Sequence, residues 1–332
     1  MQAFDYARPH SLAEALKLLS TDRDAAVVLA GGTDLLSLMK DNVIAPKRLV
    51  SLKSIEELHR VEHNAHGLRL GALVTLDTLS THPVIAQHYP GLAEAALGVS
   101  SPQIRNMGTV GGDLCQRPRC WYFRGGYGLL ALDQGKALVP DGDNRYHAIL
   151  GNHGPAYFVN PSSLAPILMA LDAKVRVQGP KTSREVPVAE FFRTPTSATE
   201  YENVVAANEI VTEVLIPAPA AGSHQAVYEV RQKEALDWPL AAAAVHVHLA
   251  GNKVTTARIV LGHVAPTPWR AEAAEQMLVG KAVNEDVATA VGRAAVMGAS
   301  PLSRNAYKVQ LARVAVKRAL LRATGQLAVP KA

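Results

Sequence analysis

The segment Ala30-Gly31-Gly32-Thr33-Asp34-Leu35-Leu36 decides how this chain is organised. It follows an apolar, strand-like run over Ala25–Leu29 and opens a helical pattern that extends to Lys40. Two adjacent glycines at such a turn let backbone N–H groups come close to a ligand, because no Cβ stands in the way. With the hydroxyl of Thr33 and an N-cap at Asp34, the segment predicts an anion cradle that suits a diphosphate. Many strand-to-helix turns use paired glycines for geometry alone, so the segment needs a second observation.

A second glycine-rich segment, Thr109-Val110-Gly111-Gly112-Asp113, lies further along the chain. It has the same ingredients as the first segment: a small hydroxyl, two adjacent glycines and a short acidic side chain. Two such segments can bind one extended ligand, the first at its diphosphate and the second along its sugar or ribityl chain. We therefore predict that the two segments face one binding site. Two independent structural turns are the alternative.

Length and composition indicate an ordinary globular protein. The 332 residues are enough for two or three domains, and 48% of them are hydrophobic while 19% are charged. The net charge of +5 is dispersed along the chain. The basic residues near the C-terminus lie on an amphipathic helical pattern without interleaved aromatic side chains, which argues against nucleic-acid binding.

The sequence also predicts where the protein works. No apolar run approaches the roughly 18 residues that span a bilayer, so we expect no membrane insertion. The first residues carry no export signal, and Cys115 and Cys120 are too few for a disulfide framework. We therefore expect a cytoplasmic protein.

Periodicity predicts an α+β fold in three regions, at residues 1–55, 56–220 and 224–328. A linker rich in proline and alanine at 217–223 separates the last two. Residues 116–153 lack periodicity and are typical of a functional or relic insertion. Strands are expected at 25–29, 48–52, 68–74, 173–177, 210–216, 226–230, 240–249 and 254–264, and helices at 11–20, 35–40, 76–80, 92–99, 164–171, 271–279, 284–297 and 307–323.

Other patterns in the sequence carry less chemistry. Gly126-Tyr127-Gly128-Leu129-Leu130-Ala131 matches the dinucleotide-binding fingerprint in letters, but no core strand precedes it and no helix clearly follows. We therefore interpret this match as coincidence. Trp121, Tyr122 and Phe123 either stack on a planar ring or fill a core. No serine elbow, acid pair or His-Asp-Ser order stands out, so the chain is typical of a cofactor carrier and we predict no catalytic residue.

Cysteine and histidine do not form a metal-binding pattern. Cys115 and Cys120 cannot by themselves complete a tetrahedral zinc site or a four-cysteine cluster. Free thiols are favoured over a mixed site with His147 and His153, and we predict no metal site in this chain. Three further candidates are interpreted as ordinary strand histidines: His246, His248 and His263.

Taken together, the segments Val27–Leu36 and Gln103–Asp113 resemble those of the FAD-binding medium subunit in the xanthine dehydrogenase and aldehyde oxidoreductase family, the molybdenum hydroxylases. The similarity extends to the opening at 3–9 and to Gly262–Arg270. It implies an FAD-binding domain of the vanillyl-alcohol-oxidase and p-cresol-methylhydroxylase type. Its two subdomains would be residues 1–55 and 56–220, and the family's flavoprotein C-terminal domain would be residues 224–328.

The resemblance implies an oxidoreductase subunit of a heterotrimer. In this family a large subunit carries molybdopterin and oxidises the substrate, a small subunit carries two [2Fe-2S] clusters, and FAD passes the electrons to an acceptor. An aldehyde is the favoured substrate of the complex, and an N-heterocycle, as in xanthine dehydrogenase, is the alternative. A scaffold subunit that has lost its flavin and a self-contained flavin oxidase are further alternatives. Export to the periplasm with a partner subunit is the alternative to a cytoplasmic location.

The resemblance also implies which residues contact FAD. The N–H groups of the first glycine pair and of Thr33 would bind its diphosphate, and the second segment would contact the flavin and the ribityl–phosphate side. The first set comprises Val27, Val28, Leu29, Ala30, Gly31, Gly32, Thr33, Asp34 and Leu35. The second set comprises Thr109, Val110, Gly111, Gly112 and Asp113.

The sequence departs from the family pattern in three places. Residues 116–153 resemble an insertion that holds a [4Fe-4S] cluster through four cysteines in one subfamily, but only Cys120 has a counterpart here, so we predict no such cluster. Ser163 stands where an aspartate usually contacts FAD, and Glu229 stands where a lysine is common. An anion in place of a cation near the flavin should lower its reduction potential and weaken the binding of an anionic flavin.

Overall fold

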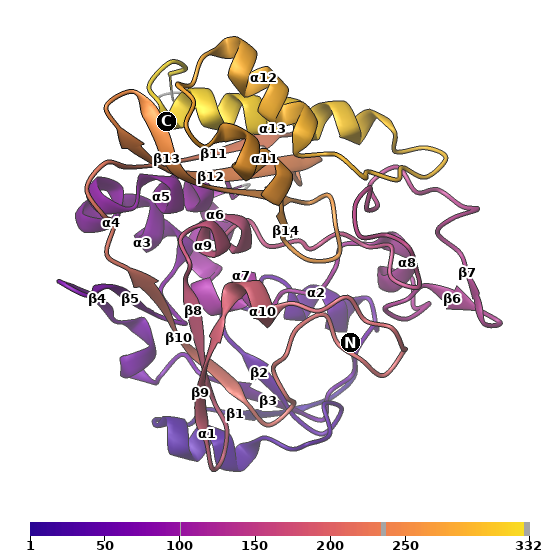
Figure 1. Ribbon diagram of the computed structural model, residues 1–332. Coiled ribbons are helices and arrows are strands. Elements are labelled where there is room, and N and C mark those ends of the chain that lie inside the picture. Colours follow the sequence, from indigo (N-terminus) through magenta and orange to yellow (C-terminus); the bar gives the residue numbers. More distant parts are fainter. Residues whose placement is uncertain (100, 234–236, 329–332) are drawn as a thin grey trace.

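Three large β-sheets, a small two-stranded one and the helices packed on them form the computed structural model of the protein, which describes residues 1–99, 101–233 and 237–328 (Figure 1). The first sheet is parallel, in the order β1 (Asp5–Ala7), β3 (Arg48–Ser51), β2 (Val27–Leu29). Helix α1 (Leu12–Leu18) follows β1, and a short 3-10 turn at Glu56–His59 leads into the second sheet. The predicted strand, glycine turn and helix are confirmed, because β2 leads directly through Gly31 and Gly32 into α2 (Leu35–Lys40).

The second sheet is antiparallel and joins segments that are far apart in the sequence. Its order is β4 (Val61–Asn64), β5 (Gly67–Gly71), β10 (Ile210–Pro217), β8 (Lys174–Gln178), β9 (Ser183–Pro187). In the register of the central pair, Glu213 of β10 lies opposite Gly71 of β5. The helices associated with this sheet are α3 (Leu76–Thr81), α4 (Pro83–His88), α5 (Pro90–Leu97), α6 (Pro102–Met107), α7 (Val110–Cys115), α9 (Ala165–Ala170) and α10 (Val188–Phe191).

The third sheet is antiparallel and buried on both faces. Its order is β11 (Ser223–Val230), β12 (Ala241–Ala250), β13 (Lys253–Gly262), β14 (Trp269–Arg270). Helices α11 (Glu272–Leu278), α12 (Glu285–Ala294) and α13 (Tyr307–Ala323) cover its outer face, at the top of Figure 1. Along β12, Ala243 and Val245 pack under these helices, while Ala244 points into the core shared with the second sheet. Burial on both faces explains why this strand reads as a continuous apolar run.

The segment 116–153 is largely irregular, as expected, with only short elements: α8 (Trp121–Arg124), β6 (Leu132–Asp133) and β7 (Lys136–Ala137). Buried polar side chains of the C-terminal region hold its backbone. Lys308 Nζ donates to the carbonyls of Tyr146 (3.2 Å), His147 (3.0 Å) and His263 (2.8 Å). Asn305 Nδ2 donates to the carbonyls of His147 (3.2 Å) and Ala148 (3.1 Å). An irregular backbone can be buried here because these donors satisfy its carbonyl groups.

Within the described part of the chain, none of the helices combines the length and the apolar character needed to cross a bilayer. The division at residues 55, 220 and 224 stays a prediction.

Candidate functional site

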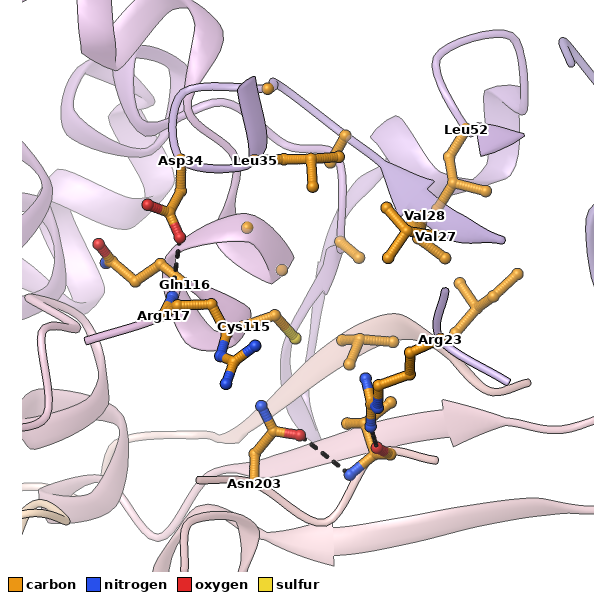
Figure 2. A pocket seen from close by; sticks show the side chains of 18 of the residues that line it. Arg23, Val27, Val28, Asp34, Leu35, Leu52, Cys115, Gln116, Arg117 and Asn203 are labelled. Atoms are coloured by element: carbon orange, nitrogen blue, oxygen red, sulfur yellow. Dashed lines mark hydrogen bonds between the residues drawn. The ribbon is translucent and has the colours of Figure 1, made fainter. Parts of the chain in front are cut away.

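A cavity of about 230 Å³ lies between the first and the second sheet (Figure 2). Both glycine segments reach it, as the sequence predicted. The residues of the first segment that line it are Val27, Val28, Ala30, Gly31, Gly32, Thr33, Asp34 and Leu35, and those of the second are Thr109, Gly111 and Gly112. The two segments also approach one another closely, since a Cβ built on Gly31 would lie 1.8 Å from the carbonyl oxygen of Met107, shortly before the second segment. Only glycine at position 31 permits this approach.

The first segment presents a run of unused hydrogen-bond donors. In the described part of the chain, the backbone N–H groups of residues 31–35 donate no hydrogen bond. The first amide of this turn that is bonded within the helix is that of Leu36, which donates to the Gly32 carbonyl at 3.2 Å. Gly32 has a φ of +78°, a conformation that glycine adopts without strain. Successive free N–H groups of this kind form an anion-binding nest.

The carboxylate of Asp34 has a different role from the one predicted. Asp34 occupies the N-cap position of α2, but its side chain accepts no hydrogen bond from the helix. Instead Oδ2 accepts from the Arg117 N–H at 2.8 Å, drawn as a dashed line in Figure 2. Oδ1 accepts from Arg124 Nη2 at 2.7 Å and forms an ion pair with Arg119 Nη1 at 2.8 Å. The expectation of a side-chain cap is therefore wrong, because a charge-assisted hydrogen bond to Arg124 together with an ion pair to Arg119 is stronger than one bond to a neutral amide.

The second segment is a wall rather than a second nest. Thr109 caps α7, since its Oγ1 accepts from the Gly112 N–H at 3.1 Å. The N–H groups of Val110 and Gly111 donate to the carbonyls of Val74 (2.9 Å) and Ala72 (2.8 Å). These amides already donate hydrogen bonds within the protein. The segment therefore offers a ligand a backbone surface with few side chains, which it can approach closely, rather than a run of free donors.

Three of the predicted residues do not line the cavity: Leu29, Val110 and Asp113. The first two are buried in hydrophobic cores. The Asp113 carboxylate accepts from Gln116 Nε2 (2.9 Å), the Leu164 N–H (3.1 Å) and the Ser162 hydroxyl. Burial raises the pKa of Asp113, and the hydrogen bonds from Ser162 and Leu164 oppose that rise. Contacts of the three residues with FAD stay a prediction.

No pattern in the sequence indicated the residues at the far end of the cavity. There the Arg23 guanidinium lies 3.9 Å from the centre of the Tyr201 ring and donates to the Val205 carbonyl, while the Arg117 guanidinium lies 4.6 Å from the same ring centre. Burial lowers the pKa of Arg23, and within the described ranges no carboxylate forms an ion pair with it. Figure 2 shows Arg23 and Asn203 on the side of the cavity opposite Asp34. This end therefore favours an anionic or aromatic group.

A second cavity, of about 180 Å³, lies between the segment 116–153 and the C-terminal region. Its lining includes Cys120, Trp121, His147 and His263, and Cys120 Sγ lies 3.1 Å from His147 Nε2. Burial lowers the pKa of His147 to about 4 and that of His263 to about 3, so both imidazoles are neutral at neutral pH. Trp121 thus lines this cavity, whereas Phe123 packs in a separate small hydrophobic core.

The two cysteines do not come together. Cys115 lines the first cavity, where burial raises the pKa of its thiol to about 12, whereas Cys120 lines the second. His246 is bonded through both ring nitrogens, to the Ala170 carbonyl (3.1 Å) and to Ser223 Oγ (2.7 Å). In the part of the chain that the structure describes, no three His, Cys, Asp or Glu side chains are placed to hold a metal ion.

The two departures near the expected flavin contacts are partly compensated. The Ser163 N–H donates to Asp113 Oδ1 at 3.3 Å, so an acid lies beside the position where the family has one. The Glu229 carboxylate pairs with the Arg231 guanidinium, and burial raises the pKa of Glu229. The ion pair and the raised pKa both reduce the negative charge at Glu229, and the effect of Ser163 and Glu229 on a flavin stays a prediction.

Comparison with known proteins agrees with this geometry. The family model "FAD binding domain in molybdopterin dehydrogenase" matches residues 2–219, and "CO dehydrogenase flavoprotein C-terminal domain" matches residues 226–323. The chain is 32% identical over 340 residues to the aldehyde oxidoreductase FAD-binding subunit PaoB of Escherichia coli K12, covering 98% of this chain and 100% of that protein. It is also 32% identical over 321 residues to the carbon monoxide dehydrogenase medium chain of Hydrogenophaga pseudoflava, covering 96% of each.

A solved structure extends the likeness to three dimensions. The carbon monoxide dehydrogenase from Hydrogenophaga pseudoflava that lacks the Mo-pyranopterin moiety superimposes with a TM-score of 0.75 at 31% identity, over 98% of this chain and 99% of that chain. The α+β architecture of an FAD-binding domain followed by a flavoprotein C-terminal domain is thereby confirmed. This chain belongs to the family of FAD-binding medium subunits of the molybdopterin dehydrogenases, the molybdenum hydroxylases.

Proposed function

We propose that this chain binds FAD in the cavity between the first and second sheets and serves as the electron-transfer subunit of a heteromeric molybdenum hydroxylase. The observation that carries the proposal is that, within the described residues, the N–H groups of residues 31–35 have no hydrogen-bond acceptor. The same residues line a cavity that the second glycine segment also lines. FAD, when bound, supplies one- and two-electron redox chemistry.

The residues of this chain would bind and orient the cofactor rather than take part in its chemistry. The N–H groups of residues 31–35 would bind the diphosphate, because an anion satisfies donors that the protein leaves free. Gly111 and Gly112 would let the cofactor lie directly against the backbone of α7. Val28, Leu35 and Leu52 also line the cavity and would keep water away from the bound cofactor.

The partners follow from the same proposal. A small subunit with [2Fe-2S] clusters would deliver electrons, and a large molybdopterin subunit would oxidise the substrate. An aldehyde is the favoured substrate class, because the relatives include an aldehyde oxidoreductase subunit that aligns over nearly the whole chain. An N-heterocycle is the alternative. We propose a cytoplasmic location, which suits the two free thiols, with export beside a partner subunit as the alternative.

The proposal is tested by cofactor analysis of the purified chain and of a Gly32→Asp variant. Aspartate tolerates a positive φ better than most residues, so the fold should survive, while its carboxylate would repel a diphosphate from the nest. We expect yellow wild-type protein with flavin absorption at about 450 nm and a variant without FAD. Gly179→Ala is the control, because its new Cβ would meet no atom closer than 3.5 Å.

Two results would contradict the proposal: wild-type protein that binds no added FAD, or a Gly32→Asp variant that retains it. The first result would favour the scaffold alternative, for which the departures at Ser163 and Glu229 are the motivation.

A further inference from the structure

A continuous chain of polar contacts joins the two glycine segments through Arg119. On one side, Arg119 Nη1 lies 2.8 Å from Asp34 Oδ1, at the start of α2. On the other side, Arg119 Nη2 donates to Gln116 Oε1 at 3.1 Å. Gln116 in turn donates from Nε2 to Asp113 Oδ1 at 2.9 Å, within α7. One guanidinium therefore connects the side of the cavity that carries the nest with the side formed by the second segment.

The far end of this chain of contacts is fixed in the protein core. The Asp113 carboxylate accepts from the N–H groups of Ser163 (3.3 Å) and Leu164 (3.1 Å), at the start of α9. Both Asp113 and Leu164 are buried. Because a carboxylate held by several donors has little freedom, it is a rigid anchor for Gln116 and, through Gln116, for Arg119.

Arg119 is itself well ordered by its surroundings. Its side chain is 26% exposed, and its guanidinium lies 4.3 Å from the centre of the Trp238 ring, which belongs to the C-terminal region. Burial lowers the pKa of Arg119 to about 10, so the group stays charged at neutral pH. The guanidinium thus keeps its ion pair with Asp34 under working conditions.

Arg124 makes a useful contrast with Arg119, because it also pairs with Asp34, at 2.7 Å. Its remaining hydrogen bonds go to the carbonyls of Pro118 (3.0 Å) and Arg117 (3.1 Å), inside the segment 116–153. Arg124 therefore ties Asp34 to that segment alone. Arg119 is the guanidinium whose contacts continue to the second glycine segment.

We propose that Arg119 is a positioning residue for the cofactor, which holds the N–H nest at residues 31–35 and the wall at 109–112 in a fixed relation through Asp34, Gln116 and Asp113. The inference rests on the proposed function, since it assigns a role within the same cavity. Loss of Arg119 breaks the side-chain link from Asp34, at the start of α2, to Gln116 and Asp113, at α7, and a cofactor that spans both segments is then held less firmly.

The experiment is a double-mutant cycle on the release of FAD from the full-length holoprotein, followed by the rise in fluorescence of free FAD. The variants are Arg119→Gln, Asp34→Asn and the double variant, with Arg145→Gln as the control. Arg145 pairs with Asp143 at 2.6 Å in the same segment, with side chains 54% and 31% exposed, and it touches neither glycine segment. The unfolding midpoint of each apoprotein is measured in parallel.

We expect each single variant to release FAD about tenfold faster than wild type, the double variant to be no faster than Asp34→Asn alone, and Arg145→Gln to match wild type. A merely structural role would lower the unfolding midpoint of the apoprotein and leave the release rate unchanged. A wild-type release rate in Arg119→Gln, or a double variant that shows the product of the two single effects, would overturn the proposal.

Arg119→Lys keeps the test decisive if Arg119→Gln does not fold. Lysine retains the charge beside Asp34 but has a single ammonium group in place of the two-sided fork. We expect faster release than in wild type and slower release than in Asp34→Asn, and a wild-type rate would overturn the proposal. Wild-type protein that binds no FAD at all would instead remove the proposed function, so the two failures are distinguishable.

Discussion

Replacing Gly31 by alanine tests whether the two glycine segments act as one site. A Cβ at this position would lie 1.8 Å from the Met107 carbonyl oxygen, 2.7 Å from the Met107 carbonyl carbon and 3.3 Å from Gly108 Cα. These are backbone atoms, so no change of rotamer can relieve the overlap. The turn at residues 31–32 or the turn at 107–108 must move, and either movement separates the nest from the wall of the second segment.

The expected magnitude follows from the nature of the clash. Overpacking in a well-packed region costs about 1–3 kcal/mol, and a clash with rigid backbone belongs at the upper end of this range. If opening of the cavity absorbs the strain, about 3 kcal/mol corresponds to FAD binding that is roughly 100-fold weaker. Gly32→Ala should have a smaller effect. Its Cβ would meet only the side chains of Leu36 (3.2 Å) and Leu29 (3.3 Å), and its φ of +78° costs about 1 kcal/mol.

The assay is titration of apoprotein with FAD, followed by quenching of flavin fluorescence, together with urea unfolding of the apoprotein. The dissociation constant should rise in the order Gly179→Ala, Gly32→Ala, Gly31→Ala, with the first equal to wild type. A Gly31→Ala variant that binds FAD within about threefold of wild type and unfolds at the wild-type midpoint would refute the reasoning. It would mean that the two segments do not approach one another as closely as residues 31 and 107 indicate.

Three further outcomes are expected. Burial lowers the pKa of His147 to about 4, against about 6.5 in an unfolded chain, so the unfolded chain binds the extra proton between these values and stability falls as the pH falls. His147→Gln should therefore lose about 3 kcal/mol less than wild type between pH 7 and pH 4 in urea unfolding, and an equal loss would contradict the assignment. Lys308→Met leaves the carbonyls of Tyr146 and His263 without their donor, while Asn305 still donates to that of His147, and should lower the free energy of unfolding by about 3 kcal/mol or more. Its control, Lys317→Met, removes an ion pair at the surface and should stay within about 0.5 kcal/mol of wild type in the same urea unfolding. Because the two cysteines lie in different cavities, metal analysis of the purified chain should find less than one iron atom per chain, and about four would contradict the predicted absence of a [4Fe-4S] cluster.

The local elements of the fold could be predicted from the sequence, because their signals are local. The run into Gly31 and Gly32 and the long apolar strands β12 and β13 match their expected positions closely. Strand β4 was missed, because three of its four residues are exposed and it therefore shows no alternation. The pairing of β10 with β5 also could not be predicted from the sequence, since no residue pattern in either strand indicates its distant partner.

Helix α7 shows how tertiary contacts override local preference. Its second and third residues are Gly111 and Gly112, which are poor helix formers, so the sequence indicated only a glycine-rich segment. The structure forms the helix because Thr109 caps it and because the carbonyls of Ala72 and Val74 accept its first amides. These acceptors lie on a segment that the sequence places far from the glycines.

The candidate site could be predicted in its location but not in its chemistry. Paired glycines identified the two segments. They are a signal of the site because the close approach of two backbone segments requires glycine, as it does at Gly31. The contribution of Arg23 and Tyr201 was missed, since neither residue lies near a glycine or in a periodic pattern. The role of Asp34 was misread for a related reason, because its partners Arg119 and Arg124 come from the irregular segment 116–153.

The unequal use of N–H groups explains why two similar segments serve one cavity. In the nest, the amides of residues 31–35 have no acceptor among the residues that the structure describes, so an anion there gains hydrogen bonds that these residues do not make. In the second segment, the corresponding amides already bond to Ala72, Val74 and Thr109, so that side keeps its shape whether or not a ligand is present. Affinity for a diphosphate therefore resides in the first segment. The second segment supplies a preformed surface. This surface adds to cofactor binding only while the ion pair of Asp34 and Arg119 keeps the two sides of the cavity in a fixed relation.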